Sequence, residues 1–280
     1  MINKNNPVVV NSYFKEDLDQ SNYISNICQQ SMDCVNNSSL YGYYQYNDIL
    51  VPRVTRILDT AIGNKGLIEW ASKVGYRRMN SIREAALNVG SLVHEMIEYN
   101  LNTNMDKDVN FSDYNMDDND IHSVICSYNN YKAWKQHLLS TGNVINKIIG
   151  TEVPVVCPWY GGTIDCIMVI NGATYIIDFK TSKQISLEYI LQVCAYAWII
   201  NTNYSNICSK IDGFGILRFD KRYEGQFEEY FVTANTNPEL WNYYTGAFWS
   251  VCNSFYNIVY TGDLLNQSII LPEYQIPIKE

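Results

Sequence analysis

The spacing of apolar residues predicts a helical first half of the chain. Between residues 80 and 101, apolar side chains recur at three- and four-residue steps, which is the spacing of an amphipathic helix. We expect this helix to begin at Asn80 or Ser81, with Glu84 completing a capping box. Shorter helices are expected at 54–62, 66–74 and 121–140. The residues predicted to face the core are Ile82, Ala86, Val89, Val93, Ile97, Tyr128, Tyr131, Trp134 and Leu138.

Beyond residue 144 the pattern takes on the two-residue period of strands. The dipeptide Asn171-Gly172 separates two such segments and favours a tight hairpin, because both residues tolerate the positive φ of a type I′ turn. A break at Gly150 interrupts the first segment. The strands are expected at 145–157, 162–170, 173–180, 211–219 and 226–234, and further helices at 186–201 and 237–260.

This order of elements predicts an α/β fold with four regions along the chain. We expect a polar, partly irregular N-terminal arm at 1–50 and a helical region at 51–143, which includes an acidic loop at 102–120. A central mixed β-sheet flanked by helices is expected at 144–235, followed by a C-terminal helix and tail at 236–280.

Composition predicts a globular protein without a membrane segment. The 280 residues are 47% hydrophobic and 18% charged, and no apolar run reaches the roughly 20 residues that a transmembrane helix needs. The N-terminus lacks the features of a signal peptide, so we expect a cytoplasmic location. The eight cysteines form no CxxC pair and are therefore expected to be free, buried thiols.

Two acids and a lysine on the predicted hairpin give the strongest chemical signal. Asp178 lies in an apolar run, where a carboxylate is costly unless it has a partner or binds a cation. Lys180 projects from the same face of that strand, and Asp165 lies on the partner strand. Two carboxylates held together repel each other, and a divalent cation such as Mg²⁺ or Mn²⁺ offsets that repulsion.

Residues 161–196 read GGTIDCIMVINGATYIIDFKTSKQISLEYILQVCAY. This stretch resembles the nuclease core of the PD-(D/E)XK superfamily, in particular its RecB-like exonuclease branch. The upstream segments VPRVTRIL and LIEW are similar to a segment of phage and mitochondrial genome-maintenance exonucleases, so the resemblance covers roughly residues 51–235. The residues that match the motifs are Gly90, His94, Gly162, Asp165, Asp178, Lys180, Thr181, Gln192 and Tyr196.

The resemblance implies a restriction-endonuclease-like core and a hydrolase that cuts DNA with Mg²⁺ or Mn²⁺, using two ions. It implies that Lys180 orients the attacking water, and that Gln192 and Tyr196 on one helix face steady Lys180 or a substrate phosphate. Together with Lys180, Gln192 and Tyr196, the acids Asp165 and Asp178 form the implied catalytic set. The implied metal ligands are His94, Asp165, Asp178 and the backbone carbonyl of Phe179, with Glu152 as a further candidate.

Cations are concentrated just before the helix that carries His94. The net charge of −9 argues against a broadly basic surface, but it leaves room for one basic groove that binds DNA. Arg53 stands where the similar exonucleases carry serine. The residues predicted to contact DNA are Arg53, Thr55, Arg56, Arg77, Arg78, Arg83, Thr181 and Lys183, with Arg218, Lys221 and Arg222 beside Lys183 on the opposite wall.

The expected activity is that of a DNA exonuclease acting on single strands or DNA ends in phage-type replication or recombination. Its partners would be DNA and phage replication or recombination proteins, in the host cytoplasm if a phage encodes it. The chain lacks a phosphate-loop motif and a late cysteine cluster, so neither ATP nor an iron–sulfur cluster is expected. The alternatives are a structure-specific endonuclease, a processing nuclease similar to those of CRISPR adaptation, and a catalytically silent DNA-binding scaffold.

Overall fold

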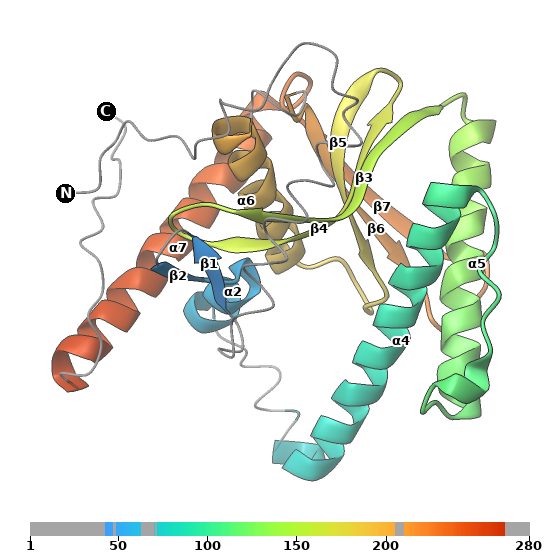
Figure 1. Ribbon diagram of the computed structural model, residues 1–280, viewed down its shortest axis with the longest axis horizontal. Helices are drawn as coiled ribbons and strands as arrows, with labels where there is room; N and C mark the ends of the chain where they lie inside the picture. Colours follow the sequence, from blue (N-terminus) through green and yellow to red (C-terminus); the bar gives the residue numbers. More distant parts are fainter. Residues whose placement is uncertain (1–42, 47–48, 63–69, 71, 205–209, 267–280) are drawn as a thin grey trace.

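The computed structural model describes residues 43–46, 49–62, 70, 72–204 and 210–266 (Figure 1). Helices flank a five-stranded mixed sheet, and a separate two-stranded sheet lies near the N-terminal end of the described chain. This architecture is consistent with a restriction-endonuclease-like core, so the predicted fold class is confirmed.

The five strands of the central sheet lie in chain order. They are β3 (Ile145–Val156), β4 (Gly161–Ile170), β5 (Ala173–Lys180), β6 (Gly213–Phe219) and β7 (Phe227–Thr233). Strands β5 and β6 run parallel, whereas the other neighbours are antiparallel. Parallel neighbours need a crossover connection, which helix α6 (Leu187–Asn203) provides. The chain therefore leaves the sheet after Lys180 and returns through a helix that packs on β5 and β6.

Both irregular points predicted along the first three strands are present. Asn171 and Gly172 turn the β4–β5 hairpin with φ values of 50° and 83°, as a type I′ turn requires. The register between β3 and β4 shifts between Ile148 and Gly150, at the predicted break. Such a shift adds twist to the strand and changes the direction in which the following side chains point.

Helices cover both faces of the sheet and divide the core in two (Figure 1). On one face, α4 (Tyr76–Thr103) and α5 (Asp118–Ser140) enclose a cluster that includes the fully buried Tyr131 and Trp134. On the other face, α2 (Val54–Ile62), α6 and α7 (Pro238–Asn266) enclose the second cluster. The four residues predicted to form the inner face of α5 are all buried, which confirms their assignment to the core.

Helix α4 is longer than the sequence predicted. It begins directly after Gly75, which has a φ of 85° and ends the preceding segment. The predicted start at Asn80 or Ser81 is wrong, because both residues lie inside the helix and no capping box begins there. Ile82 is 44% exposed and Ala86 is also exposed, although both were expected in the core. Their half of α4 extends beyond the sheet (Figure 1).

Residues 43–46 and 49–52 form two paired strands in a part of the chain that was mostly expected to be irregular. Strands β1 (Tyr43–Tyr46) and β2 (Ile49–Pro52) pair antiparallel. The buried ring of Tyr44 packs on Gly161, where an added Cβ would lie 2.9 Å from the ring. Its hydroxyl lies 3.2 Å from Thr163 Oγ1. Packing on β4 therefore orders a segment whose polar sequence gives no clear local preference.

Other expectations are met within the described part of the chain. The cysteines at 126, 157, 166, 194 and 252 are free and buried, and those at 28, 34 and 208 lie outside the described residues. Between α4 and α5, a short 3-10 helix, η1 (Phe111–Asp113), interrupts the acidic loop. Most of the helix expected at 66–74 and most of the predicted arm also lie outside the described residues. None of the described helices combines the length and hydropathy that crossing a bilayer requires.

Candidate metal centre

Three carboxylates lie in one row across the central sheet. The β3–β4 register places Glu152 opposite Asp165, and the β4–β5 register, continued by one pair, places Asp165 opposite Asp178. Neither pair belongs to the regular ladder. Asp165 instead fills the opening between β4 and β5, where its Oδ2 accepts the backbone N–H of Phe179 at 2.7 Å. The three acids therefore meet where the sheet is irregular.

Helix α4 brings His94 to this row. The Nδ1 atom of His94 lies 3.6 Å from Asp165 Oδ2, and its Nε2 atom lies 2.8 Å from the carbonyl oxygen of Phe179. The Phe179 ring also meets the imidazole edge to face, which restrains its orientation. His94, Glu152 and Asp165 each offer a ligand atom within 4.8 Å of the other two, so this cluster could hold a metal ion.

Glu152 occupies a strained position in β3. Its φ of 48° is unusual for a residue other than glycine and costs conformational energy in the middle of a strand. Thr151 beside it donates to Glu98 on α4 at 3.0 Å and accepts from Asn102 at 3.1 Å, which fixes the segment. Although the side chain keeps contact with solvent, burial and then the charge of Asp165 raise the pKa of Glu152 to about 7. Strain and crowded charge together are typical of a functional site.

Asp178 and Lys180 form a buried pair at the end of β5. Asp178 is 2% exposed, and Lys180 Nζ lies 2.7 Å from both carboxylate oxygens, donating a hydrogen bond to Oδ1. Burial raises the pKa of Asp178. Burial alone would lower the pKa of Lys180, but the charge of Asp178 raises it above its usual value. The proton therefore stays on Lys180, and the pair presents an ammonium beside a carboxylate.

One oxygen of Asp178 is suited to a metal ion. Among the described residues, Asp178 Oδ2 accepts no hydrogen bond of good geometry. A buried oxygen that accepts no hydrogen bond lowers the stability of the folded protein. Carboxylate and carbonyl oxygens are the ligands that Mg²⁺ and Mn²⁺ prefer. The Asp178 carboxylate, the Phe179 carbonyl and the cluster of His94, Glu152 and Asp165 therefore fit a divalent cation.

The side chain of Tyr196 packs helix α6 against the start of β4, and Gln192 hydrogen-bonds to its hydroxyl. Gln192 Nε2 donates to the Tyr196 hydroxyl at 3.2 Å. The buried Tyr196 ring lies directly over Gly162, where an added Cβ would be 2.4 Å from the hydroxyl. Only glycine leaves room for this ring. Within the described part of the chain, Lys180 contacts Asp178 and a different aromatic residue of α6.

The aromatic residue of α6 that contacts Lys180 is Tyr189, which is not among the residues predicted from the sequence. Lys180 Nζ lies 4.8 Å from the centroid of the Tyr189 ring. Tyr189 precedes Gln192 by three residues and Tyr196 by seven, so the three share one face of α6. Glu98 was missed as well, one turn after His94 on α4 and bonded to Thr151. Both residues could have been found from the sequence, because each lies three or four residues from a motif residue on the same helix.

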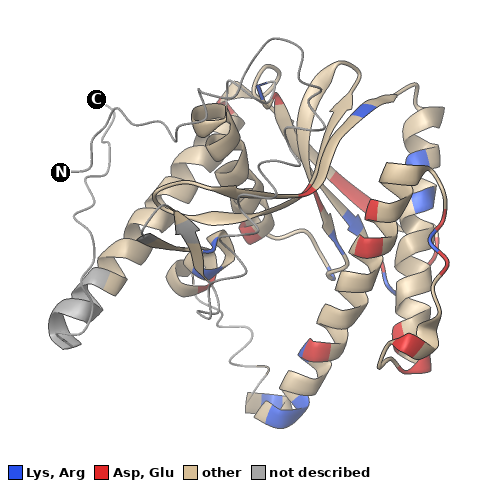
Figure 2. Cartoon of the chain, viewed as in Figure 1, with Lys and Arg blue, Asp and Glu red and all other residues tan. Residues whose placement is uncertain are grey.

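The arginines of α4 lie in its N-terminal part. Arg77, Arg78 and Arg83 are exposed, and Figure 2 shows the cations at the tip of the helix beyond the sheet. Burial raises the pKa of Asp59 on α2, and the charge of Arg83 acts against that rise. Arg83 of α4 therefore lies near Asp59 of α2.

Two further arginines stack on tyrosine rings of β1. The guanidinium of Arg53 lies 5.4 Å from the centroid of Tyr44, and that of Arg56 lies 4.7 Å from the centroid of Tyr43. Such cation–π contacts restrain an arginine while leaving its N–H groups free to bind. Thr55 is exposed between them at the start of α2.

Thr181 and Lys183 lie on the loop that follows β5. The hydroxyl of Thr181 faces α4 at Gly90, where an added Cβ would be in ordinary contact at 3.6 Å. Lys183 is exposed on the same loop. This loop is therefore held between α4 and the start of α6, next to Lys180.

The expectation that Arg218 lines the opposite wall is wrong. Its side chain is buried, and its charge is neutralised by two carboxylates, so it offers no cation to a ligand. Arg218 instead ties the loop after Lys180 to the end of β6. Its guanidinium donates to Asp220 Oδ2 at 3.2 Å, to Glu228 Oε1 at 2.9 Å and to the carbonyl oxygen of Ser182 at 3.2 Å. In the same turn Arg222 is exposed, with Lys221 half-buried beside it.

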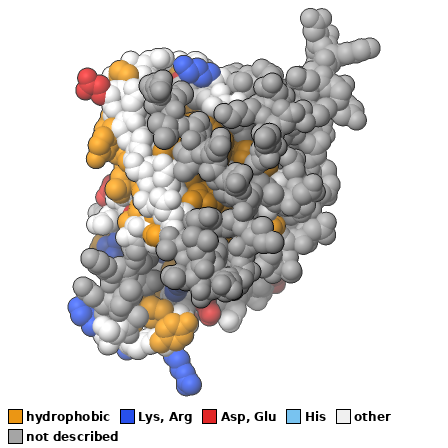
Figure 3. Space-filling model, turned by 90° about the vertical axis from the view of Figure 1, so that its left-hand side faces the viewer, with side chains coloured by type: hydrophobic (Ala, Val, Ile, Leu, Met, Phe, Trp, Pro, Cys, Tyr) orange, Lys and Arg blue, Asp and Glu red, His pale blue; other side chains and the backbone are white. Residues whose placement is uncertain are grey.

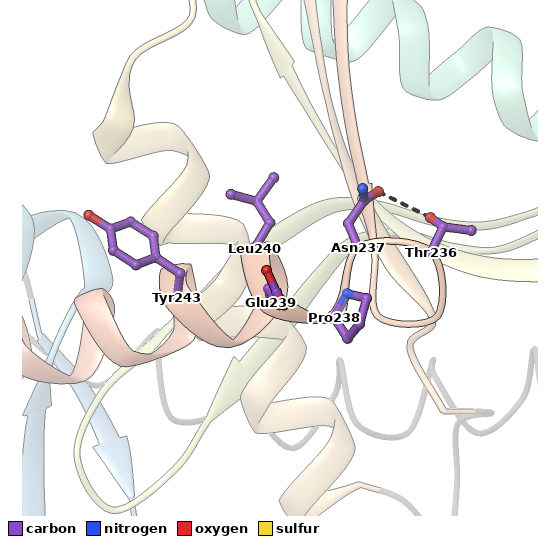
Figure 4. Close-up of a pocket in the computed structure, with 6 residues that line it drawn as sticks. All are labelled: Thr236, Asn237, Pro238, Glu239, Leu240 and Tyr243. Carbon is purple, nitrogen blue, oxygen red and sulfur yellow. Dashed lines mark hydrogen bonds between the residues drawn. The ribbon is translucent and has the colours of Figure 1, made fainter.

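A separate hollow, whose lining includes none of the acid-row residues, lies at the start of α7 (Figure 4). Glu239 is the one acid among its lining residues, and no histidine, cysteine or cation accompanies it there. This lining provides no catalytic or metal-binding set, so we assign the chemistry to the acid row. The hollow is lined by Thr236, Asn237, Pro238, Glu239, Leu240 and Tyr243.

Comparisons with known proteins give only distant likenesses. No family model and no curated protein sequence matches the chain. The structure resembles that of SSO0001 at 8% identity and a TM-score of 0.33, over 88% of this chain and 87% of that one. It resembles an alkaline exonuclease from Laribacter hongkongensis at 12% identity and a TM-score of 0.27, over 49% of this chain and 70% of that one. Neither likeness is close enough to bear on function.

Proposed function

We propose that the protein is a metal-dependent deoxyribonuclease that hydrolyses phosphodiester bonds with an activated water. The observation that supports this most strongly is the row of Glu152, Asp165 and Asp178, which His94 and Lys180 join where the sheet opens. Burying the Asp178 carboxylate costs stability even beside Lys180, and one of its oxygens accepts no hydrogen bond of good geometry from the described residues. A role in binding a cation explains that cost, whereas a purely structural role does not.

Each residue of the centre has a part in this proposal. Bound Mg²⁺ or Mn²⁺, with two ions in the proposed active form, would lower the pKa of the attacking water and offset charge on the phosphate. Lys180 keeps its proton and so can hold that water or stabilise the charge that develops on the phosphate. Gln192 and Tyr196 keep α6 fixed on β4 and so preserve the spacing of the row.

Helix α4 supports a path for one DNA strand. Arg83 and Leu87 precede His94 by close to three and two helical turns, so they lie on the same face of α4. Leu87 is 58% exposed, and Tyr76, five turns before His94, is 71% exposed. Arginines bind phosphates, and exposed apolar or aromatic side chains contact bases without sequence preference.

This basic and apolar end is local to α4. In Figure 3, Lys, Arg and hydrophobic side chains lie together at the lower end of the molecule, the end that α4 reaches in Figure 1. Arg78 lies roughly 24 Å from His94 along the helix, at about 1.5 Å per residue. A single strand or a frayed DNA end can span that distance, so we propose that the substrate approaches the centre along α4.

We propose exonuclease action in phage-type replication or recombination, with DNA as the partner. The motif set that includes Asp165, Asp178, Lys180 and Gln192 supports this assignment. The intact Asp178–Lys180 pair argues against a catalytically silent DNA-binding protein. Such a protein has no need of a buried ion pair next to the carboxylates of Glu152 and Asp165. The choice between exonuclease and endonuclease depends on whether a free end is required.

The test uses end-labelled single- and double-stranded DNA, as linear and as circular molecules. Each is incubated with the protein in Mg²⁺, Mn²⁺ or EDTA. The proposal expects metal-dependent cleavage of linear DNA and none of circular DNA. Cleavage of circular DNA would establish endonuclease action, and no cleavage of any substrate with either metal would defeat the proposal.

A further inference from the structure

The ring of Tyr189 contacts the lysine of the metal centre. Lys180 Nζ lies 4.8 Å from the ring centroid, and the Lys180 side chain is 18% exposed. Among the described residues, the ammonium also contacts the carboxylate of Asp178 at 2.7 Å. Lys180 is therefore held between one carboxylate and one aromatic face.

These two partners of Lys180 respond differently to a bound cation. The Asp178 carboxylate is the group that a cation at this site also attracts, so its hold on the ammonium weakens when a cation binds. The face of the Tyr189 ring attracts an ammonium through its quadrupole, and this attraction is larger where water is excluded. The aromatic contact is therefore the one that stays available to Lys180.

The helix fixes the position of the Tyr189 ring. Tyr189 is half-buried and packs against the core between the sheet, α2, α6 and α7. Its neighbours Ile190 and Leu191 are buried, and the next turns of the same helix face carry Gln192 and Tyr196. Because the packed helix restricts movement of the Tyr189 ring, the ring can hold the Lys180 ammonium in one position. A ring on a mobile loop would move together with the lysine.

We propose that Tyr189 is a positioning residue, whose ring face keeps the Lys180 ammonium in place for the attacking water when Asp178 engages a cation. This inference rests on the proposed nuclease function. It assigns the role to the aromatic face and not to the hydroxyl, so it distinguishes two substitutions at one position.

The kinetic test compares Tyr189→Phe, which keeps the ring, with Tyr189→Leu, which removes it. In Mn²⁺ we expect kcat of Tyr189→Phe to stay within about twofold of wild type and that of Tyr189→Leu to fall roughly tenfold, with KM changed by less than about twofold. Tyr243→Leu, an exposed tyrosine on α7, is the matched control and should leave kcat unchanged. Equal losses in both Tyr189 variants, or no loss in Tyr189→Leu, would overturn the proposal.

A second readout needs neither metal nor activity. Protons above an aromatic face resonate upfield, so in metal-free protein labelled at lysine Cε we expect the Lys180 signal, assigned with Lys180→Arg, to be shifted upfield. The shift should persist in Tyr189→Phe and disappear in Tyr189→Leu, or in Tyr189→Met if the leucine variant does not fold. A shift that survives removal of the ring would refute the contact. Because this spectrum is independent of cleavage, an inactive wild type would defeat the nuclease proposal without touching this result.

Discussion

At the scale of single residues, two features of Glu152 are energetically unfavourable, its backbone conformation and the position of its charge. Its backbone is left-handed within a strand, and its carboxylate faces Asp165. Folded proteins keep such costs where the surrounding structure enforces them, and here Thr151 is tied to Glu98 and Asn102 on α4. The acid row is therefore held in a high-energy arrangement before any cation binds.

The raised pKa of Glu152 gives a pH dependence with a definite sign. Its pKa is about 7 in the folded protein against an ordinary 4.5, so the unfolded chain loses this proton first and stability falls as pH rises through that window. We expect metal-free Glu152→Gln to melt roughly 2–4 °C above wild type at about pH 8, which corresponds to about 1 kcal/mol after solvent screening is allowed for. Near pH 4 the two should melt alike.

Thermal unfolding in EDTA at both pH values checks this expectation. Glu84→Gln, an exposed acid of α4, is the control and should match wild type throughout. A Glu152→Gln variant that is less stable than wild type at the higher pH would contradict the account of this residue.

Two glycines of the motif set are expected to respond in opposite ways to alanine. At Gly162 the new Cβ would meet the Tyr196 hydroxyl at 2.4 Å in a buried site, so Gly162→Ala should cost roughly 1–3 kcal/mol. At Gly90 the nearest atom is 3.6 Å away, so Gly90→Ala should gain roughly 0.5–1 kcal/mol from helix propensity. Denaturant unfolding of both variants measures the difference, and equal effects would show that Tyr196 does not set the spacing.

At the scale of elements, α4 joins the metal centre to the proposed DNA path. Its second half packs on α5 and the sheet and delivers His94, whereas its first half extends beyond the sheet and carries the exposed arginines (Figure 2). One continuous helix thus connects the two sites. Substitutions of the exposed arginines near its N-terminal end should change DNA binding without changing cation binding at the acid row.

The double substitution Arg77→Ala/Arg78→Ala tests this separation. We expect DNA affinity to fall by roughly tenfold or more at low salt, and the slope of log affinity against log salt to decrease by about 1.4 for a single strand. Fluorescence anisotropy measures the first effect and calorimetry with Mn²⁺ should show unchanged cation binding. Lys132→Ala/Lys147→Ala removes the same charge from other elements and is the control. Unchanged DNA affinity in the arginine variant would rule out this path.

The elements differ in how well the sequence predicts them. The five strands and the Asn171-Gly172 turn follow local rules, so their positions could be predicted. The start of α4 could not, because Asn80 and Ser81 favour a helix end only when the helix does not continue past them. Tyr44 shows the same limit, since its strand depends on packing against Gly161, which is distant in the sequence.

The candidate site follows the same division. Asp178 and Lys180 share a strand face, and spacing alone places them together. The position of Glu152 opposite Asp165 depends on the register shift in β3, and the burial of Arg218 depends on acids of the β6–β7 hairpin. Both features depend on how the strands pair, and local spacing in the sequence does not determine that pairing.

At the scale of the whole molecule, a net charge of −9 coexists with a proposed DNA substrate. Several acids are gathered at the acid row, where a bound cation would offset their charge. The remaining negative charge would disfavour DNA elsewhere on the surface and so favour the proposed binding at the end of α4. Binding should therefore weaken steeply with salt despite the acidic composition.

The central claim is that the acid row and Lys180 together hydrolyse DNA. The most direct measurement is the single-turnover cleavage rate of end-labelled single-stranded DNA in Mn²⁺, for wild type and for Lys180→Ala, with Mn²⁺ affinity measured on both. We expect wild type to cleave, EDTA to stop the cleavage, and Lys180→Ala to cleave roughly a hundredfold or more slowly while still binding Mn²⁺. Cleavage by Lys180→Ala at the wild-type rate, or no cleavage by wild type in Mn²⁺, would contradict it.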